Sequence, residues 1–256
     1  MRSMASSGSN RGIAAVVGVG PKLGRSIARK FAHEGYTVAI LARDLGRLSR
    51  FADEIAREEK AQVFAIRIDC SESRSVKEAF EGVLSLGFVE VLVYNAYQPM
   101  SWQYPTNFAD IRVDSFEKSL SVSSVGAFHC AQHRKGDNSV HRLLGFAERH
   151  CWEFQPLGVH VAHVIIDGLI GPPRAGIGGG SGSSGSGGGG GGSSSTGQRT
   201  SVGEQVQSGG GGGGGGGGEG GMDPNALAQT YWHLHVQDRT AWTQEIDLRP
   251  SNSRFF

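Results

Sequence analysis

The chain has 256 residues, with 25 basic and 24 acidic side chains and a formal net charge of +1. Without a long run of either sign, this balance argues against a nucleic-acid backbone or an anionic membrane as partner. No apolar stretch reaches the roughly 18–20 residues of a membrane span. Cys70, Cys130 and Cys151 form neither an even set nor a CxxC pair, so we expect a reducing, cytoplasmic location. The serine- and arginine-rich start leaves an organelle transit peptide as the alternative.

The glycines are concentrated in one tract. Residues 176–221 hold 26 of the 41 glycines, together with serine and almost no apolar side chains. Such a segment buries too little surface to offset its chain entropy, so we expect a disordered Gly/Ser-rich linker. This divides the chain into a first segment, 1–175, the linker itself, and a last segment, 222–256, which we expect to complete the same domain as the first.

Short apolar runs alternate with amphipathic segments in the first hundred residues. Strands are predicted at 13–19, 36–42, 62–68 and 88–95, and helices at 23–34, 45–60 and about 73–86. Apolar strands that alternate with amphipathic helices indicate a parallel sheet covered on both faces, because each parallel crossover needs a helix. We therefore predict an α/β fold with a doubly wound parallel sheet.

The next predicted element is a long helix at 114–132. We expect its buried stripe to contain four residues, Phe116, Leu120, Ala127 and Cys130. The segment 133–152 is irregular, with no strand-like run, although 159–166 is again a clear strand. Only 26 residues separate Gln132 from Val159, fewer than the roughly 30 of a further strand-and-helix unit. We therefore expect one central strand to be missing.

The last segment opens with Asp223 as a helix N-cap and Pro224 at the first helical position. The helix covers 226–235, and Leu227, Tyr231 and Leu234 share one of its faces. A short final strand is predicted at 241–248. The C-terminal segment thus supplies one more helix and one more strand to the domain.

The sharpest motif is VVGVGPKLGRS at 16–26, between the first strand and the first helix. The first glycine permits a tight turn, the second lets the backbone approach a phosphate, and the third lets the helix approach the sheet closely. The residues assigned to this phosphate loop are Gly18, Gly20, Lys22, Leu23 and Gly24. We predict a nucleotide-phosphate site at this helix N-terminus, and the alternative is a glycine-rich turn without a ligand.

Two positions at strand ends bear on which nucleotide binds. Arg43 directly follows the second strand, where an acid would accept the ribose hydroxyls of NAD and a basic group would meet the 2′-phosphate of NADP. NADP is therefore favoured over NAD. The alternative is that Arg43 is a solvated charge and Asp44 caps the next helix. Asp69, after the third strand, either accepts from the adenine amino group or caps the helix that follows.

Together these motifs resemble the short-chain dehydrogenase/reductase family, especially a branch with a GxGPxLG phosphate loop. The resemblance covers residues 12–132 best, and more loosely 153–171 and 222–249. It implies a Rossmann-type fold, an NAD(P)-dependent oxidoreductase acting on a carbonyl or alcohol, and a possible homodimer. It also implies that Asn95 and Ala96 stand beside the cofactor.

The resemblance breaks down where the family carries out proton transfer. The family uses a tyrosine, a lysine four residues later and a serine. No tyrosine here has lysine at that spacing, the segment 133–152 is unpatterned, and Ser123 stands at the family's asparagine position. The catalytic residues are therefore unknown, with Tyr97 as the remaining candidate proton donor.

No metal site is predicted to replace the family's chemistry, because His160 and His163 lie three apart in a strand and face opposite sides. The pair His233 and His235 also diverges, about 200° apart around a helix. Two alternatives to an active oxidoreductase therefore stay open. One is a nucleotide-binding pseudoenzyme without catalysis, and the other is a truncated, marginally folded product.

Overall fold

The computed structural model describes residues 11–98, 110–132, 142–144, 158–173 and 221–251, which fall in one compact unit. The strands are β1 (Ile13–Val17), β2 (Thr37–Ala42), β3 (Val63–Arg67), β4 (Val89–Tyr94), β5 (Arg142–Leu144), β6 (His160–Ile166) and β7 (Glu245–Leu248). The helices are α1 (Leu23–His33), α2 (Leu45–Glu59), α3 (Ser73–Leu86), α4 (Val113–Leu120), the π-helical turn η2 (Ser121–Val125), α5 (Gly126–Gln132) and α7 (Pro224–Val236). Within the described ranges, no helix combines the length and the apolar character needed to cross a bilayer. The linker expected at 176–221 lies outside them except for its last residue.

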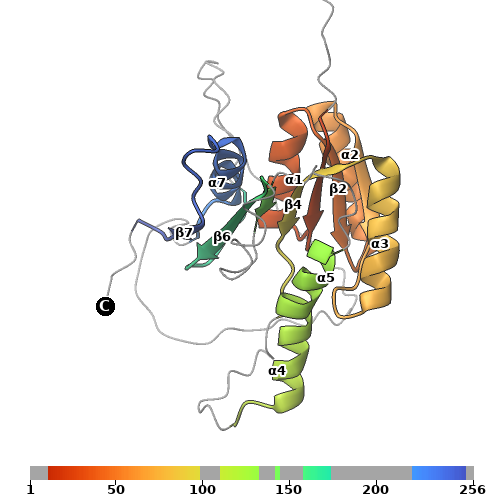
Figure 1. Cartoon of the computed structure of the whole chain (residues 1–256), viewed down its shortest axis with the longest axis vertical. Coiled ribbons are helices and arrows are strands. Elements are labelled where there is room, and N and C mark those ends of the chain that lie inside the picture. The colour runs from red at the N-terminus through yellow and green to blue at the C-terminus, as the bar shows by residue number, and fades with distance from the viewer. Residues whose placement is uncertain (1–10, 99–109, 133–141, 145–157, 174–220, 252–256) are drawn as a thin grey trace, which may run out of the picture. The chain divides into compact units, whose positions relative to one another are not determined.

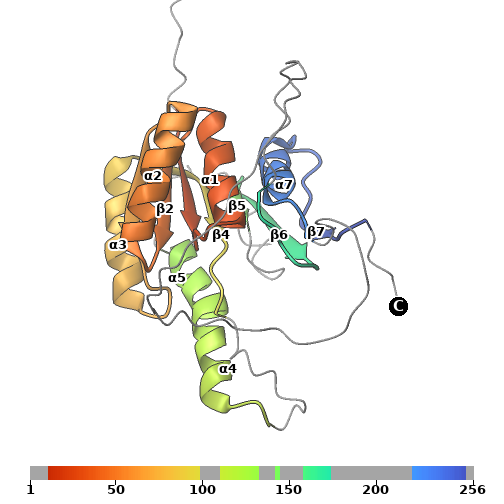
Figure 2. The ribbon, with the colours of Figure 1, turned by 180° about the vertical axis from the view of Figure 1, so that it is seen from behind.

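The strands form one parallel sheet in the order β3-β2-β1-β4-β5-β6-β7 (Figure 1). Two apolar clusters place α1, α2 and α7 on one face of the sheet and α3 and α5 on the other; Figure 2 shows the first face. The predicted doubly wound α/β fold is thus confirmed. The strand order reverses between β1 and β4, and ligands of such sheets bind at the carboxyl ends of the strands beside this reversal.

The residues of β1 explain why this strand lies in the middle of the sheet. Ala14 and Val16 point into the cluster under α1, whereas Ala15 and Val17 point into the cluster under α3. All are fully buried. A strand covered on both faces needs apolar side chains at every position, which is the continuous run that the sequence shows.

The expectation that a central strand is missing is wrong. In the structure β5 lies between β4 and β6, and it pairs in parallel with both, with Leu143 opposite Leu92 and Val161. A strand of three residues is too short to give a recognisable sequence pattern. This strand forms because its backbone pairs with a strand on each side. The sheet is therefore continuous from β4 to β6. The remainder of the segment 133–152 lies outside the described residues.

The predicted long helix is interrupted by the π-helical turn η2, between α4 and α5. Ala127 and Cys130 are buried as predicted, but Phe116 and Leu120 are 48% and 43% exposed. The prediction failed for these two because α4 extends beyond the sheet (Figure 1) and has no buried residue. Burial begins at Val122, inside η2.

The C-terminal elements join the same sheet. Asp223 caps α7 by accepting from the Asn225 backbone N–H at 2.9 Å, and Pro224 occupies the first turn, as predicted. The face formed by Leu227, Tyr231 and Leu234 is buried in the cluster with α1. β7 pairs with β6 but starts at Glu245, four residues later than predicted. Before it, the Thr243 backbone N–H donates to the Gln237 side-chain oxygen at 2.8 Å rather than to a strand.

Two backbone hydrogen bonds join the flanks of residues 174–220. Gly171 N–H donates to the Met222 carbonyl at 2.9 Å, and Met222 N–H donates to the Leu169 carbonyl at 2.8 Å. Because the ends already meet, we expect replacement of 174–220 by Gly-Ser-Gly to preserve the fold. Loop-closure entropy predicts a gain of about 1–2 kcal/mol in the free energy of unfolding, measured by urea denaturation.

A shuffled tract with the same length and composition is the matched control for this excision, and we expect it to unfold like the parent chain. Loss of the cooperative transition in the shortened chain would show that the tract contributes folded contacts. The two bridging hydrogen bonds would then be insufficient to hold the flanks.

Candidate functional site

Three glycines shape the loop between β1 and the start of α1. The structure around each one differs, and so does the reason why glycine suits that position. Gly18 has φ of +86°, and a Cβ there would lie 2.4 Å from the Ala96 nitrogen. A Cβ at Gly24 would lie 2.8 Å from the Gly18 carbonyl oxygen. A Cβ at Gly20 would meet nothing within 4 Å, because this backbone faces open space. The loop therefore offers bare backbone at the start of α1, where N–H groups lack helical acceptors.

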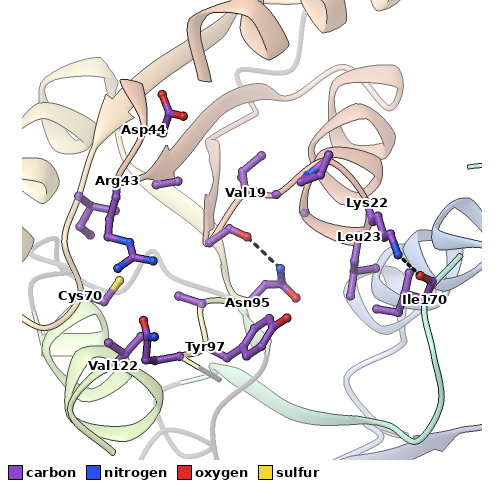
Figure 3. Close-up of a pocket in the computed structure, with 18 of the residues that line it drawn as sticks. Val19, Lys22, Leu23, Arg43, Asp44, Cys70, Asn95, Tyr97, Val122 and Ile170 are labelled. Atoms are coloured by element: carbon purple, nitrogen blue, oxygen red, sulfur yellow. Dashed lines mark hydrogen bonds between the residues drawn. The ribbon is translucent and has the colours of Figure 1, made fainter. Parts of the chain in front are cut away.

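A cavity of about 780 Å³ lies at this loop, within the size range of ligand sites. It is lined from the ends of β1, β2, β3, β4 and β6, and Figure 3 shows these side chains. Every position that the sequence analysis assigned to the cofactor lines it: Gly18, Gly20, Lys22, Leu23, Gly24, Arg43, Asp69, Asn95 and Ala96. The structure thus brings together residues that lie as much as 78 positions apart in the sequence.

Asn95 and Lys22 hold the walls of the cavity in place. Asn95 Nδ2 donates to the Gly18 carbonyl at 3.0 Å, which fixes the glycine turn to the end of β4. Lys22 Nζ donates to the Ile170 carbonyl at 2.5 Å, and this bond joins the phosphate loop to the segment after β6 (Figure 3). An ammonium group has three donors, so Lys22 retains two for a bound anion.

Neighbouring charges at the end of β2 have different roles. Asp44 caps α2, accepting from the Arg47 backbone N–H at 3.0 Å, and its other oxygen pairs with the Arg47 guanidinium at 3.0 Å. These hydrogen bonds, the backbone one first, hold the pKa of Asp44 below its usual range. Arg43 lines the cavity, and in the described parts of the chain no carboxylate lies within 4.0 Å of it. Among the described residues, the Arg43 guanidinium therefore faces the cavity without a contacting carboxylate, whereas Asp44 is already paired.

Asp69 belongs both to a turn and to the cavity wall. Its Oδ1 accepts from the Ser71 N–H at 3.0 Å and from the Ser71 hydroxyl at 2.6 Å, just before α3. The Ser71 hydroxyl, aided by the charges of Arg43 and Arg67, lowers the pKa of Asp69. Oδ2 accepts no hydrogen bond from the described residues. The turn and the adenine contact proposed for this residue are therefore compatible.

Several residues that line the cavity were not assigned from the sequence. Arg47 lies in the first turn of α2, Cys70 directly follows Asp69, and Ile170 follows the strand β6. In a parallel sheet the carboxyl ends of all strands share one edge. Counting a few residues past every predicted strand would therefore have identified the last two positions.

The catalytic candidates are less well placed. Tyr97 lines the cavity and is 73% exposed, and its hydroxyl makes no hydrogen bond to a described residue. Ser123 lies in η2 and is not among the lining residues. Among residues with a described position, no three His, Cys, Asp or Glu side chains gather as a metal site would require. Among the described residues, the cavity thus combines a glycine loop and basic side chains with Tyr97 as the candidate proton donor.

The comparisons with known sequences agree with this geometry. The model of the short chain dehydrogenase family matches residues 12–134. Sorbitol-6-phosphate 2-dehydrogenase of Escherichia coli K12 is 30% identical over 122 residues, which are 47% of this chain and 46% of that protein. An uncharacterised oxidoreductase of Caenorhabditis elegans is 38% identical over 89 residues, 34% of this chain and 28% of the relative. The chain thus spans less than half the length of these two relatives.

Similar solved structures cover nearly the whole chain. A short-chain dehydrogenase from Rhodopseudomonas palustris superimposes with a TM-score of 0.64 at 19% identity, covering 93% of this chain and 98% of the other. An alcohol dehydrogenase from Thermococcus sibiricus, in complex with 5-hydroxy-NADP, gives a TM-score of 0.65 at 18% identity, with coverage of 96% and 99%. At such identities the likeness establishes the fold.

Proposed function

Because the chain belongs to the short-chain dehydrogenase family through residues 12–134, we propose that it binds NADP(H) and acts as an oxidoreductase on a carbonyl or alcohol. The glycine cradle, the cavity and the basic side chains fit a dinucleotide with phosphate groups. In this proposal the cofactor contacts are the nine lining residues predicted from the sequence. A bound NADPH supplies the hydride for a carbonyl carbon.

One observation favours NADP over NAD, and it is the contrast between Arg43 and Asp44. The acid that could accept the ribose hydroxyls of NAD is committed to the α2 cap and to Arg47. The guanidinium beside it faces the cavity without a carboxylate partner among the described residues. A guanidinium binds phosphate through paired, charge-assisted hydrogen bonds, so Arg43 suits the 2′-phosphate.

Reduction of a carbonyl also needs a proton for the oxygen. Tyr97 is the only tyrosine among the described lining residues, so we assign it as the candidate donor. The sequence has no Tyr-x-x-x-Lys pair. This absence favours a second candidate function, in which the protein binds the nucleotide without turnover.

A steady-state assay of NADPH oxidation with a panel of aldehydes and ketones separates the two functions. We expect any turnover to depend on Tyr97, so that Tyr97→Phe lowers kcat at least about tenfold with little change in NADPH binding. Absence of NADPH oxidation by folded, NADPH-bound protein would favour the non-catalytic function. Turnover that survives Tyr97→Phe would reject Tyr97 as the donor.

We also propose a homodimer in the cytoplasm. The helices α4, η2 and α5 carry an exposed apolar stripe: Val113, Phe116, Leu120, Val125 and Phe128. Apolar stripes of this kind are typical of association surfaces. The buried, free Cys70 and Cys130 fit a reducing compartment. Sedimentation equilibrium would test the dimer, and a monomer at micromolar concentration would contradict it.

A further inference from the structure

Two free cysteines, Cys70 and Cys130, lie close to the end of the cavity that Arg43 and Asp69 line. Cys70 follows Asp69 and lines the cavity, whereas Cys130 lies on α5 and is fully buried. Both belong to the same apolar cluster, and a Cβ at Gly126, one helical turn before Cys130 on α5, would lie 2.9 Å from the Cys70 Cβ. The cofactor contacts proposed above include neither thiol, so this pair is available for other chemistry.

Close backbone approach holds the pair in place. Gly126 lies four residues before Cys130, and a Cβ there would be 2.6 Å from the Cys70 carbonyl oxygen and 2.8 Å from the Tyr94 hydroxyl. The Tyr94 hydroxyl in turn donates to the Val122 carbonyl in η2. Movement of η2 and α5 away from Cys70 would therefore break the hydrogen bond from Tyr94 to Val122.

The surroundings make the two thiols unequal. The neighbouring Cys130 thiol, with smaller contributions from Tyr94 and the Arg43 charge, lowers the pKa of Cys70. The Arg43 guanidinium lies near the Cys70 sulfur in Figure 3. The Cys70 thiol and burial raise the pKa of Cys130. Cys70 is thus the nucleophilic member, and the cavity gives a small oxidant access to it.

We propose that Cys70 and Cys130 form a reversible disulfide in response to peroxide, and that this disulfide weakens nucleotide binding. The Cys70 thiolate attacks one oxygen of hydrogen peroxide; the O–O bond breaks, and the other oxygen leaves as water after taking up a proton. Cys130 sulfur then attacks the Cys70 sulfenic acid, forming the S–S bond and releasing a second water that carries the Cys130 proton. The cysteines lose two electrons, and the peroxide is reduced to two waters.

The effect on the cavity follows from the bond length. The two sulfur atoms, which belong to unlinked thiols in the structure, must approach to about 2.05 Å, so Cys70 is drawn toward α5 and away from its position in the cavity wall. Cys70 lies beside Asp69 and Arg43, which the proposed function assigns to the adenine and the 2′-phosphate. This part of the inference rests on that function.

The test treats the full chain with hydrogen peroxide and then measures both the linkage and NADPH binding. Trypsin gives the cysteine peptides 68–74, 119–134 and 150–174. We expect mass spectrometry to show 68–74 joined to 119–134, and the Kd for NADPH to rise at least about fivefold. Dithiothreitol should reverse both changes.

Two variants provide controls. Cys130→Ala removes the resolving thiol without altering the cavity lining, and it should abolish the linkage and the reversible loss of affinity. Cys151→Ser removes the third thiol and should respond like the parent chain. Linkage through 150–174, or a 68–74 linkage that leaves the NADPH Kd unchanged, would overturn the proposal. If the reduced chain fails to bind NADPH, the proposed function fails, while the peptide linkage still reports on the thiol pair.

Discussion

Arg43→Ala is expected to raise the Kd for NADPH about 10- to 100-fold, equivalent to roughly 1.4–2.8 kcal/mol. The loss corresponds to about one charge-assisted hydrogen bond to the 2′-phosphate. NADH lacks this phosphate, so its Kd should change less than about threefold. Fluorescence titration of both nucleotides measures the difference directly.

Arg74→Ala is the matched control for this substitution. Arg74 lies on α3, is 90% exposed and pairs with Glu78 rather than with the cavity. Arg74→Ala removes the same positive charge from the chain as Arg43→Ala does. Comparing NADPH binding by the two variants therefore separates a local contact from a general electrostatic effect. Equal losses for NADPH and NADH in Arg43→Ala would contradict the assignment of the guanidinium to the 2′-phosphate.

Gly18→Ala is expected to have the largest effect on stability. The new Cβ would lie 2.4 Å from the Ala96 nitrogen and 2.6 Å from the Asn95 carbonyl carbon, which are backbone atoms that cannot rotate away. The residue would also keep a φ of +86°, which strains an L side chain. Overpacking and strain together predict a loss of about 3–5 kcal/mol in the free energy of unfolding. Urea denaturation measures the loss.

Gly35→Ala is an unusually close control. Gly35 has the same φ of +86°, but a Cβ there would meet nothing within 4 Å. The Gly35→Ala variant therefore carries the conformational strain without the collision. Its free energy of unfolding should fall by only about 1–2 kcal/mol. Similar losses in the two variants would show that the contact between β1 and the end of β4 is not what requires glycine at position 18.

The sequence predicted the first half of the sheet well because each of its elements carries its own signal. β1 is apolar at every position, and α1 follows it with Leu23, Ile27 and Phe31 on one buried face. The phosphate loop could be predicted for the same reason, since its glycines lie close together in the chain. Residues at the ends of the other strands could be assigned to the same site once a parallel sheet was predicted, because the carboxyl ends of its strands share one edge.

The failures occurred where tertiary contacts decide the structure. The three residues of β5 form a strand because β4 and β6 lie on either side. Phe116 and Leu120 repeat at helical spacing but remain exposed, since no described element covers α4. The contact of Lys22 with the Ile170 carbonyl joins positions 148 residues apart, and no local pattern specifies it.

A thermal melt with and without nucleotide shows whether this chain folds around a working NADP site. A ligand at 100 times its Kd adds about 2.7 kcal/mol to the native state, or about 5–10 °C in Tm for a domain of this size. We predict a cooperative transition that NADPH raises by this amount and that NADH at the same concentration raises less. A cooperative transition that neither nucleotide shifts would show that the chain has no working nucleotide site, and the absence of any cooperative transition would show that it does not fold.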